Sequence, residues 1–488
     1  MLALKASNKI YRSLKDDFEY VEELYEQFFA VGNKNQADKA SHYLSGLIQS
    51  ERKNRNIERM VEKVTSSNYE NQQHFITNSP WDREGLLKAM SKNVSTTLKP
   101  HGLISCTVDE KAHLKKGDKS AGVARQYAGC LGKVDNCQVG VYLSLTAHKY
   151  SSLTNTRLYL PKEWTANEQR CLDAGIPKEK IVFKTKQELG LEMIKEHIES
   201  GVHFDFINGD GLYGNGYEFS KGINALGKKY VLDVHSNQKI FLQEPVIAIP
   251  PRQATQRGRV AAKLKAIAPD MSVLEYNNTL RKSDFKLVQI RKSTKGWITA
   301  HIHVKEIWVW DESNGDKQAF KQTLIIKRPI HKKDQLKFSL SNIPAQKQSV
   351  EQFAFMQAQR FWVEKCFRDD SHDLGMSDYQ VRSYNGWNNH MALTCLAMEY
   401  MLNQKLKYKI DIPLLSCNDV RELLVELIQH NKEGFDTKFD WMIDRHAKRE
   451  KDINTTLVNQ KSNSTIVFCF PQIPLIFADD VLRESAGK

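Results

Sequence analysis

The N-terminal part of the chain repeats apolar residues at helical spacing. Between residues 15 and 67, apolar and charged positions alternate so that the apolar ones return every three or four residues. This spacing places the apolar side chains on one helix face, where they can pack against a neighbouring element. The pattern predicts a helical N-terminal unit. Residues 66–80, rich in Ser, Asn and Gln, are expected to be a linker.

From Gly102 onward the apolar residues form short runs instead. Runs at 103–108, 139–145 and 203–208 predict strands, and the helical spacing of residues 187–199 predicts a helix before the third of them. Strands that alternate with a helix are typical of an α/β core.

Residues 227–345 return to strand-like runs that are separated by turn residues. We expect strands at 229–234, 297–310, 323–327 and 337–341. These runs predict a β-rich insertion into the α/β core. Helical spacing resumes at 350–369 and 386–403, and a basic helical section follows.

The patterns together divide the chain into five segments. In the N-terminal unit, residues 51–63 carry five basic residues, which would form a helix face that could lie on DNA phosphates. The five segments are a helical N-terminal DNA-binding domain at 1–80, the first part of the core at 81–226, the insertion at 227–345, the second part of the core at 346–404, and a helical, basic C-terminal region with a tail at 405–488.

The composition is that of a globular protein with an excess of positive charge. Hydrophobic residues make up 41% of the 488 residues and charged residues 26%, and the net charge of +13 favours a polyanionic partner. We interpret this partner as nucleic acid, with an unspecifically basic surface as the alternative.

The cysteines and the apolar runs bear on where the protein works. Its eight cysteines include no Cys-x-x-Cys pair, and no stretch reaches the roughly 20 apolar residues that span a bilayer. We therefore expect reduced thiols, no membrane contact and a cytoplasmic location.

Three acidic residues are candidates for catalysis. Asp109 follows an apolar run, Asp210 stands between glycines, and Glu364 lies one helical turn after Arg360. Each alone fits a strand end, a turn or a surface ion pair equally well. Together, in a basic α/β protein, they suggest phosphodiester chemistry, which needs two divalent ions held by carboxylates.

Longer stretches of the sequence resemble a known family. They are Tyr43–Leu47, Glu51–Asn54, Glu58–Met60, Gly122–Tyr127, Gly132–Val141, Met356–Arg360, Leu374–Arg382 and Gly386–Trp387. In these segments, and in the order Asp, Asp, Glu with an insertion before the Glu, the chain resembles the DDE transposases of bacterial insertion sequences. The resemblance is to the insertion-sequence family numbered seven hundred and one.

The resemblance implies a fold and an activity. The fold class would be α/β, with an RNase H-like catalytic core that carries the β-rich insertion and is flanked by helical regions. Asp109, Asp210 and Glu364 would hold two Mg²⁺ or Mn²⁺ ions. The protein would cleave the element ends by hydrolysis and join the freed 3′-hydroxyls to target DNA, as a homodimer on double-stranded DNA in the bacterial nucleoid.

Two positions depart from the family's Tyr-Arg-Glu-Lys signature. Gln357 stands in place of the Tyr, and Ser371 in place of the Lys, whereas Arg360 matches the Arg. These departures motivate an alternative, a transposase-derived DNA-binding protein that has lost catalysis. A second alternative is a metal-dependent nuclease that cuts DNA without joining it.

Several basic and aromatic residues are further candidates for DNA contacts. They are Arg360, Lys365, Arg368, Arg125, Arg52, Lys53, Arg55, Arg257, Arg259 and Trp308. The alternatives are a solvated helix face for the residues near position 55, a buried structural role for Arg125, and packing inside the insertion for Trp308.

Overall fold

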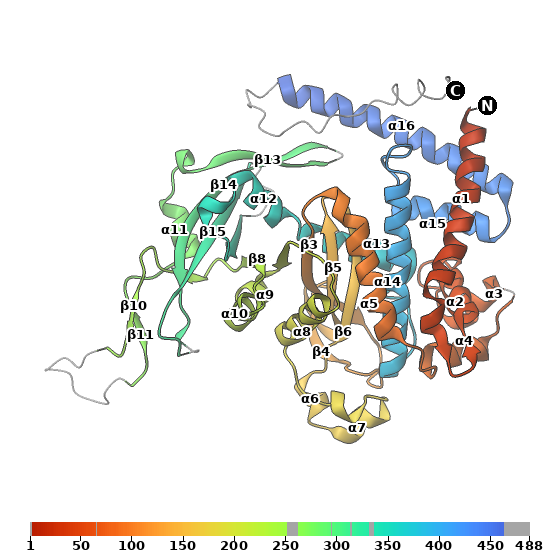
Figure 1. Cartoon of the computed structure of the whole chain (residues 1–488), viewed down its shortest axis with the longest axis horizontal. Helices are drawn as coiled ribbons and strands as arrows, with labels where there is room; N and C mark the ends of the chain where they lie inside the picture. The colour runs from red at the N-terminus through yellow and green to blue at the C-terminus, as the bar shows by residue number, and fades with distance from the viewer. Residues whose placement is uncertain are drawn as a thin grey trace.

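The structure is a computed structural model that describes residues 2–64, 66–250, 262–293, 295–312, 315–330 and 336–462. Arg257 and Arg259 lie outside the described residues. A large sheet runs through the molecule, and helices pack against it (Figure 1). Among the described helices, none is long and apolar enough to span a membrane.

The core of the sheet is built around one central strand. β3 (Ser105–Leu114) pairs antiparallel with β5 (Lys133–Ala147), and β5 pairs antiparallel with β6 (Tyr150–Leu158). On its other side β3 pairs in parallel with β7 (Phe206–Gly209), which pairs in parallel with β8 (Lys229–Val234). The short strand β4 (Ala124–Ala128) pairs with the start of β5. This mixed sheet confirms the predicted α/β class.

Helices make the two parallel connections. α8 (Lys186–Glu199) precedes β7, and α10 (Tyr217–Ala225) lies between β7 and β8. Parallel neighbours need such crossovers because the chain must return to the same end of the sheet. α8 starts where Thr185 and Glu188 cap one another's backbone groups, which satisfies amide groups that a helix start leaves free.

The strands of the insertion extend the same sheet. β16 (Lys337–Ser341) pairs antiparallel with β8, and β15 (Phe320–Pro329), β14 (Gly296–Val309) and β13 (Lys286–Ser293) follow outward. β8 and β16 have the bounds that were expected for the strands at 229–234 and 337–341. Assigning 229–234 to the insertion was wrong, because β8 is a parallel partner of β7 and belongs to the core sheet.

The helical segment expected at 350–369 forms two helices. α12 (Val350–Ala358) ends before Gln359 and Arg360, and α13 (Phe361–Asp369) begins after them. A single π-helical turn, η7 (Asp370–Leu374), follows directly. The next helix, α14 (Tyr384–Lys407), packs on β6 and α5 (Arg83–Leu98). All of its residues from 386 to 402 are buried, which explains why it shows no polar face.

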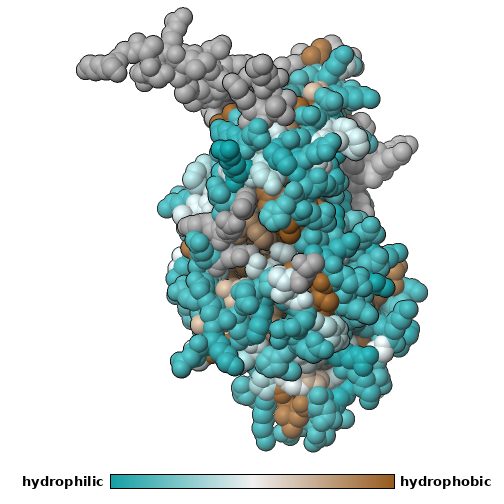
Figure 2. All heavy atoms as spheres, turned by 90° about the vertical axis from the view of Figure 1, so that its right-hand side faces the viewer, coloured by the Kyte–Doolittle hydropathy of each residue, from teal (hydrophilic) through white to brown (hydrophobic). Residues whose placement is uncertain are grey.

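The N-terminal helices pack directly on the core. They are α1 (Leu2–Tyr25), α2 (Ala37–Gln49), α3 (Ile57–Lys63) and α4 (Tyr69–Thr77). The expected linker at 66–80 was therefore wrong. Asn68 caps α4, whose Phe75 is fully buried and stacks on Trp81. Figure 2 shows this side of the molecule, which is mostly hydrophilic with small separate apolar patches.

The C-terminal helices reach back across the molecule. α15 (Cys417–Ile428) packs against α2, and α16 (Lys432–Ser462) runs from α1 to the insertion (Figure 1). There the Gln460 Oε1 atom accepts a hydrogen bond from the Trp297 backbone N–H, at 2.9 Å. The C-terminal region expected at 405–488 is thus helical as far as Ser462, and residues 463–488 lie outside the described part of the chain.

A carboxyl group is buried where α1, α5 and α14 meet. The hydroxyl of Tyr25 lies 2.7 and 2.9 Å from the two carboxyl oxygens of Glu399, and Asn93 donates to the same hydroxyl. Burial raises the pKa of Glu399 to about 8, although the bond from Tyr25 lowers it. The folded protein therefore favours the protonated carboxyl at neutral pH.

We expect Glu399→Gln to remove a pH-dependent cost to folding. Because the pKa of Glu399 is higher in the folded state than its ordinary value of 4.5, its contribution to stability is present below pH 4.5 and is lost as pH rises through 8. Each unit of pKa difference corresponds to about 1.4 kcal/mol. Urea unfolding should show similar stabilities at pH 4.5, and a variant that is several kcal/mol more stable than wild type at pH 9.

Glu433→Gln on exposed α16 is the matched control and should follow the wild-type curve at every pH. Parallel pH curves for wild type and Glu399→Gln would contradict the role given to Glu399.

Candidate active site

Asp109 lies inside β3, where the parallel pairing with β7 ends. The last parallel pair is Val108 with Gly209, while the antiparallel pairing with β5 continues through Asp109 to Leu114. The strand therefore runs beyond the expected end at Val108. Only 12% of the Asp109 side chain is exposed. Burial raises its pKa well above the ordinary value, and the negative charge of Asp210 raises it further.

Asp210 follows β7 directly and caps the short helix α9 (Gly211–Gly214). Its Oδ1 atom accepts a hydrogen bond from the Leu212 backbone N–H, at 2.9 Å. Burial raises its pKa, with a further rise from the charge of Glu110. A Cβ at Gly211 would lie 2.6 Å from the ring of His235, so a larger residue there would displace that exposed side chain.

A third aspartate, Asp233, lies beside these two and was missed from the sequence. Gly209 is the register partner of both Val108 and Leu232, so the next positions on the three strands are Asp109, Asp210 and Asp233. The apolar run before Asp233 resembles the one before Asp109 and was the only signal available.

Arg360 joins the acidic residues. Its Nη1 atom lies 3.5 Å from Asp109 Oδ2, its Nη2 atom 2.7 Å from Glu364 Oε1, and its Nε atom 3.0 Å from Asp233 Oδ2. Burial alone lowers the pKa of Arg360, but the carboxylates of Asp233, Asp109 and Glu364 raise it above its ordinary value. The structure therefore brings Asp109, Asp210 and Glu364 to one place, with Arg360 between them. The Glu364 side chain is 52% exposed.

The donor set at this place suits a hard cation. In the described part of the chain, no three His, Cys, Asp or Glu side chains are positioned to hold a metal ion. The carboxylates instead surround the guanidinium of Arg360, which shows that a cation is stabilised here. Oxygen-only ligands are those that Mg²⁺ and Mn²⁺ prefer.

The end of the helix that carries Glu364 turns away from the acidic residues. Lys365 Nζ lies 2.6 and 2.7 Å from the carboxylate oxygens of Asp369. Ser371 is buried, and its hydroxyl lies 3.2 Å from that of Ser377. Because η7 is a π-helical turn, α-helical spacing does not continue to position 371, and Ser371 faces the interior.

Basic residues surround this end of the helix. Arg52 Nη1 lies 3.4 Å from His372 Nδ1, and Lys111 Nζ donates to the Phe367 carbonyl at 3.4 Å. Burial lowers the pKa of His372, and the positive charges of Arg52, Lys111 and Arg368 lower it further. Lys111 and His372 are thus basic neighbours of the site that sequence analysis missed.

The other predicted DNA contacts differ in exposure. Arg125 on β4, together with Arg52, Lys53 and Arg368, is exposed, so the buried role considered for Arg125 is not observed. Trp308 is half-buried in β14, where its backbone pairs with Phe241 in both directions at 2.9 Å. Lys321 Nζ lies 5.4 Å from the centroid of the Trp308 ring.

Arg55 does not lie on an exposed basic face. The expected helix at 51–63 begins only at Ile57, and Arg55 lies in the loop before it, with 1% of its side chain exposed. Its guanidinium donates to Asp378 Oδ2 at 3.0 Å and to four backbone carbonyl groups. Arg55 therefore fastens the N-terminal helices to the segment that follows Glu364.

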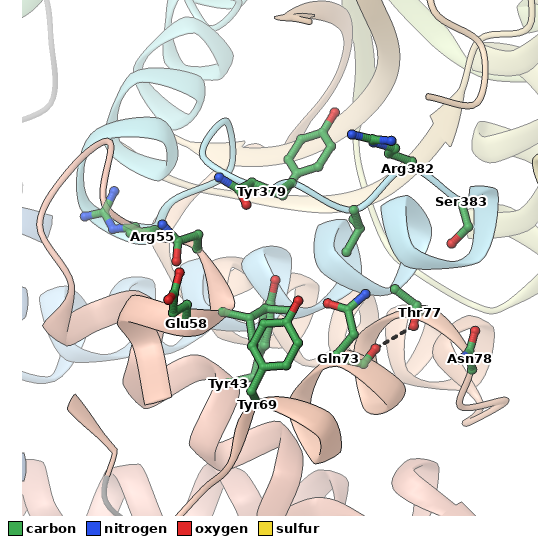
Figure 3. A pocket seen from close by; sticks show the side chains of 14 residues that line it. Tyr43, Arg55, Glu58, Tyr69, Gln73, Thr77, Asn78, Tyr379, Arg382 and Ser383 are labelled. Atoms are coloured by element: carbon green, nitrogen blue, oxygen red, sulfur yellow. Dashed lines mark hydrogen bonds between the residues drawn. The ribbon is translucent and has the colours of Figure 1, made fainter. Parts of the chain in front are cut away.

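A cavity of about 570 Å³ lies beside this contact (Figure 3). It is formed by α2, α3 and α4 on one side and by the segment between η7 and α14 on the other. Tyr43, Tyr69, Gln73, Tyr379 and Arg382 are among the residues that line it. None of the acidic residues around Arg360 does so, and the cavity is separate from the candidate active site.

Comparison with known proteins identifies the family. Residues 23–297 match the model of the family described as DDE superfamily endonuclease, and this range is more than half of the chain. The chain therefore belongs to the DDE superfamily endonucleases. The matched range contains Asp109, Asp210 and Asp233, while Arg360 and Glu364 lie beyond it.

One sequence relative indicates which kind of DDE endonuclease the chain resembles. Over 220 residues the chain is 30% identical to the probable transposase for insertion sequence element IS701 from Microchaete diplosiphon, an alignment that covers 44% of this chain and 52% of the relative. The chain thus spans about half the length of that relative. These two findings confirm the resemblance to DDE transposases of this insertion-sequence family. Superposition of this chain on the cryo-EM structure of a piggyBac transposase synaptic complex with hairpin DNA gives a TM-score of 0.39 at 11% sequence identity. The match covers 91% of this chain and 81% of that one.

We expect Arg55→Met to destabilise the protein by about 3–5 kcal/mol, since it leaves the Asp378 carboxylate and several carbonyl groups without their donor. Arg59→Met is the matched control. Arg59 forms an exposed pair with Glu62, and solvent screening leaves such pairs with little effect on stability. Urea unfolding of both variants measures the difference. Equal stabilities, with DNA affinity lost only in Arg55→Met, would indicate a DNA contact instead.

Proposed function

We propose that the protein is a DDE transposase that binds the ends of an insertion sequence, cleaves them and joins the 3′-hydroxyl ends to target DNA. The observation that carries this proposal is the convergence of Asp109 and Asp210 on adjacent parallel strands, with Arg360 linking Asp109 to Glu364. Such a set of carboxylates is what two-metal phosphodiester chemistry requires.

The proposed catalytic core is RNase H-like. Three antiparallel strands, β3, β5 and β6, are followed along the chain by the parallel strands β7 and β8. In the sheet, β3 pairs with β5 on one side and with β7 on the other. This order supports the assignment. In it, the first strand and the fourth are neighbours, which places Asp109 next to Asp210.

Asp109, Asp210 and Glu364 would hold two Mg²⁺ or Mn²⁺ ions. When bound, such ions stabilise the attacking and leaving oxygens of an in-line displacement. The buried position of Asp109 fixes its carboxylate, and the cap that Asp210 forms on α9 fixes the second one. Glu364 is more exposed, so its side chain has room to turn toward the other two carboxylates once its ion pair with Arg360 opens.

Double-stranded DNA, both element ends and target, is the proposed partner. Arg52, Lys53, Arg125 and Arg368 expose their side chains, and phosphate contacts of this type position a protein on DNA without reading its sequence. Two ends must be joined together, and we propose that a homodimer in the bacterial nucleoid does so. Arg360 is held beside the acidic residues and would contact the phosphate that reacts.

One observation bears on the alternative of a DNA-binding protein without catalysis. Ser371 faces the interior and provides no cation at the site. Lys111, on the same strand as Asp109, lies beside the end of α13, where burial lowers its pKa although the charges of Asp370 and Asp109 raise it. We propose that Lys111 takes the place of the missing lysine of the signature, as an active enzyme would need.

We expect DNA from both flanks of the gene to be cut and joined by the wild-type protein with Mg²⁺. Asp109→Asn, Asp210→Asn and Glu364→Gln should each lower the cleavage rate at least about 10²–10³-fold, the cost of removing one preorganised electrostatic group. Gel analysis of end cleavage and strand transfer measures both activities. Glu179→Gln, at an exposed position in the 3-10 turn Lys178–Lys180, is the control and should remain active.

Specific binding without cleavage by any of these proteins, in Mg²⁺ or Mn²⁺, would support the DNA-binding alternative. Cleavage without strand-transfer products would support a nuclease.

A further inference from the structure

Arg360 contacts three carboxylates, and only two of them belong to the proposed metal ligands. Its Nη1 and Nη2 atoms face Asp109 and Glu364, whereas its Nε atom faces Asp233. Two of the three contacts use oxygens that divalent ions would also bind. The contact with Asp233 uses an oxygen outside the proposed metal-binding triad.

Asp233 is itself held in place by a buried chain of hydrogen bonds. Gln357 Nε2 donates to Ser339 Oγ at 2.7 Å, and Ser339 Oγ donates to Asp233 Oδ1 at 2.6 Å. Asp233 Oδ2 then accepts from Arg360 Nε at 3.0 Å. Ser339 is fully buried and Gln357 nearly so. Gln357, which departs from the family signature, is therefore part of a continuous path to Arg360.

Competition between Arg360 and divalent ions for the same carboxylates gives this chain of hydrogen bonds a function. A divalent ion bound to the carboxylates of Asp109 and Glu364 would compete with the guanidinium of Arg360 for their negative charge. Loading of the site would weaken both contacts and free the two Nη groups for another anion. A planar guanidinium that is held only through Nε presents these two groups as a fork that matches a phosphate.

We propose that Asp233 is a positioning residue that holds Arg360 through Nε while its Nη groups pass from Asp109 and Glu364 to a DNA phosphate. Gln357 and Ser339 orient Asp233 for this purpose. The inference rests on the proposed function, because the exchange requires metal ions and DNA at the site. It adds a residue that contacts neither the reacting atoms nor the metal ions.

A double-mutant cycle tests the proposal. Asp233→Asn should lower the single-turnover cleavage rate about 10–100-fold, the usual effect of removing a partner that orients a catalytic group. In an Arg360→Ala background the same substitution should have no further effect, because Asp233 acts only through Arg360. Asp233→Glu keeps the charge and should recover part of the lost rate.

Two readouts that do not depend on cleavage accompany the cycle. Calorimetric titration with Mn²⁺ should show binding to Asp233→Asn within about 10-fold of wild type, but none to Asp109→Asn. With Ca²⁺ in place of Mg²⁺, both Arg360→Ala and Asp233→Asn should lose about one phosphate contact with flanking DNA. The loss should appear as a change of about 0.9 in the slope of log affinity against log salt concentration.

Two further sets of variants control for folding. Ser339→Ala and Gln357→Leu disturb the path further from the site and should lower the rate less than Asp233→Asn does. Asp316→Asn removes an aspartate of the insertion that binds Tyr217 and Lys221 on α10, and it should leave the rate unchanged. Thermal melting of every variant confirms that it is folded.

If the wild-type protein is active and the effects of Asp233→Asn and Arg360→Ala on the cleavage rate are additive, this inference is wrong but the proposed function stands. Loss of Mn²⁺ binding in Asp233→Asn would also overturn it and identify Asp233 as a metal ligand. A wild-type protein that neither binds Mn²⁺ nor cleaves DNA would defeat the proposed function, and this inference with it.

Discussion

One guanidinium shared by several carboxylates organises the centre of this protein. Asp109, Asp233 and Glu364 come from distant stretches of the chain, and each contacts Arg360. Burial and the negative charge of Asp210 raise the pKa of Asp109, whereas the positive charge of Arg360 lowers it. The acids are therefore kept close together by an internal positive charge.

The row of aspartates depends on strand register. β3, β7 and β8 are parallel, and a slip of one residue in either pairing would turn a carboxylate to the opposite face of the sheet. The helix after Asp210 helps to prevent such a slip. A Cβ at Gly214 would lie 1.8 Å from the carbonyl oxygen of Asp233, so glycine alone allows α9 to lie this close to β8.

Local patterns in the sequence predicted the parts of the site that depend on local structure. An apolar run before Asp109 and the four-residue spacing of Arg360 and Glu364 made those residues candidates, and the set of three acids together with the family resemblance selected them. Asp233 was missed because its position beside Asp109 follows from pairing between strands that are more than 100 residues apart. Arg55 was misread since a run of basic residues resembles an exposed helix, and only tertiary contacts show that its guanidinium is buried. The supposed linker at 66–80 is a helix because Phe75 and Ile76 find apolar partners that the sequence alone does not place.

The contact between Gln460 and the Trp297 backbone has a consequence for biosynthesis. These residues are 163 positions apart, so the β13–β14 hairpin emerges from the ribosome long before its partner on α16 has been translated. At about 5–20 residues per second, the delay is roughly ten to thirty seconds. During that time the start of β14 lacks its contact with α16, so the hairpin is held first by its pairing with β15 and its packing on α12.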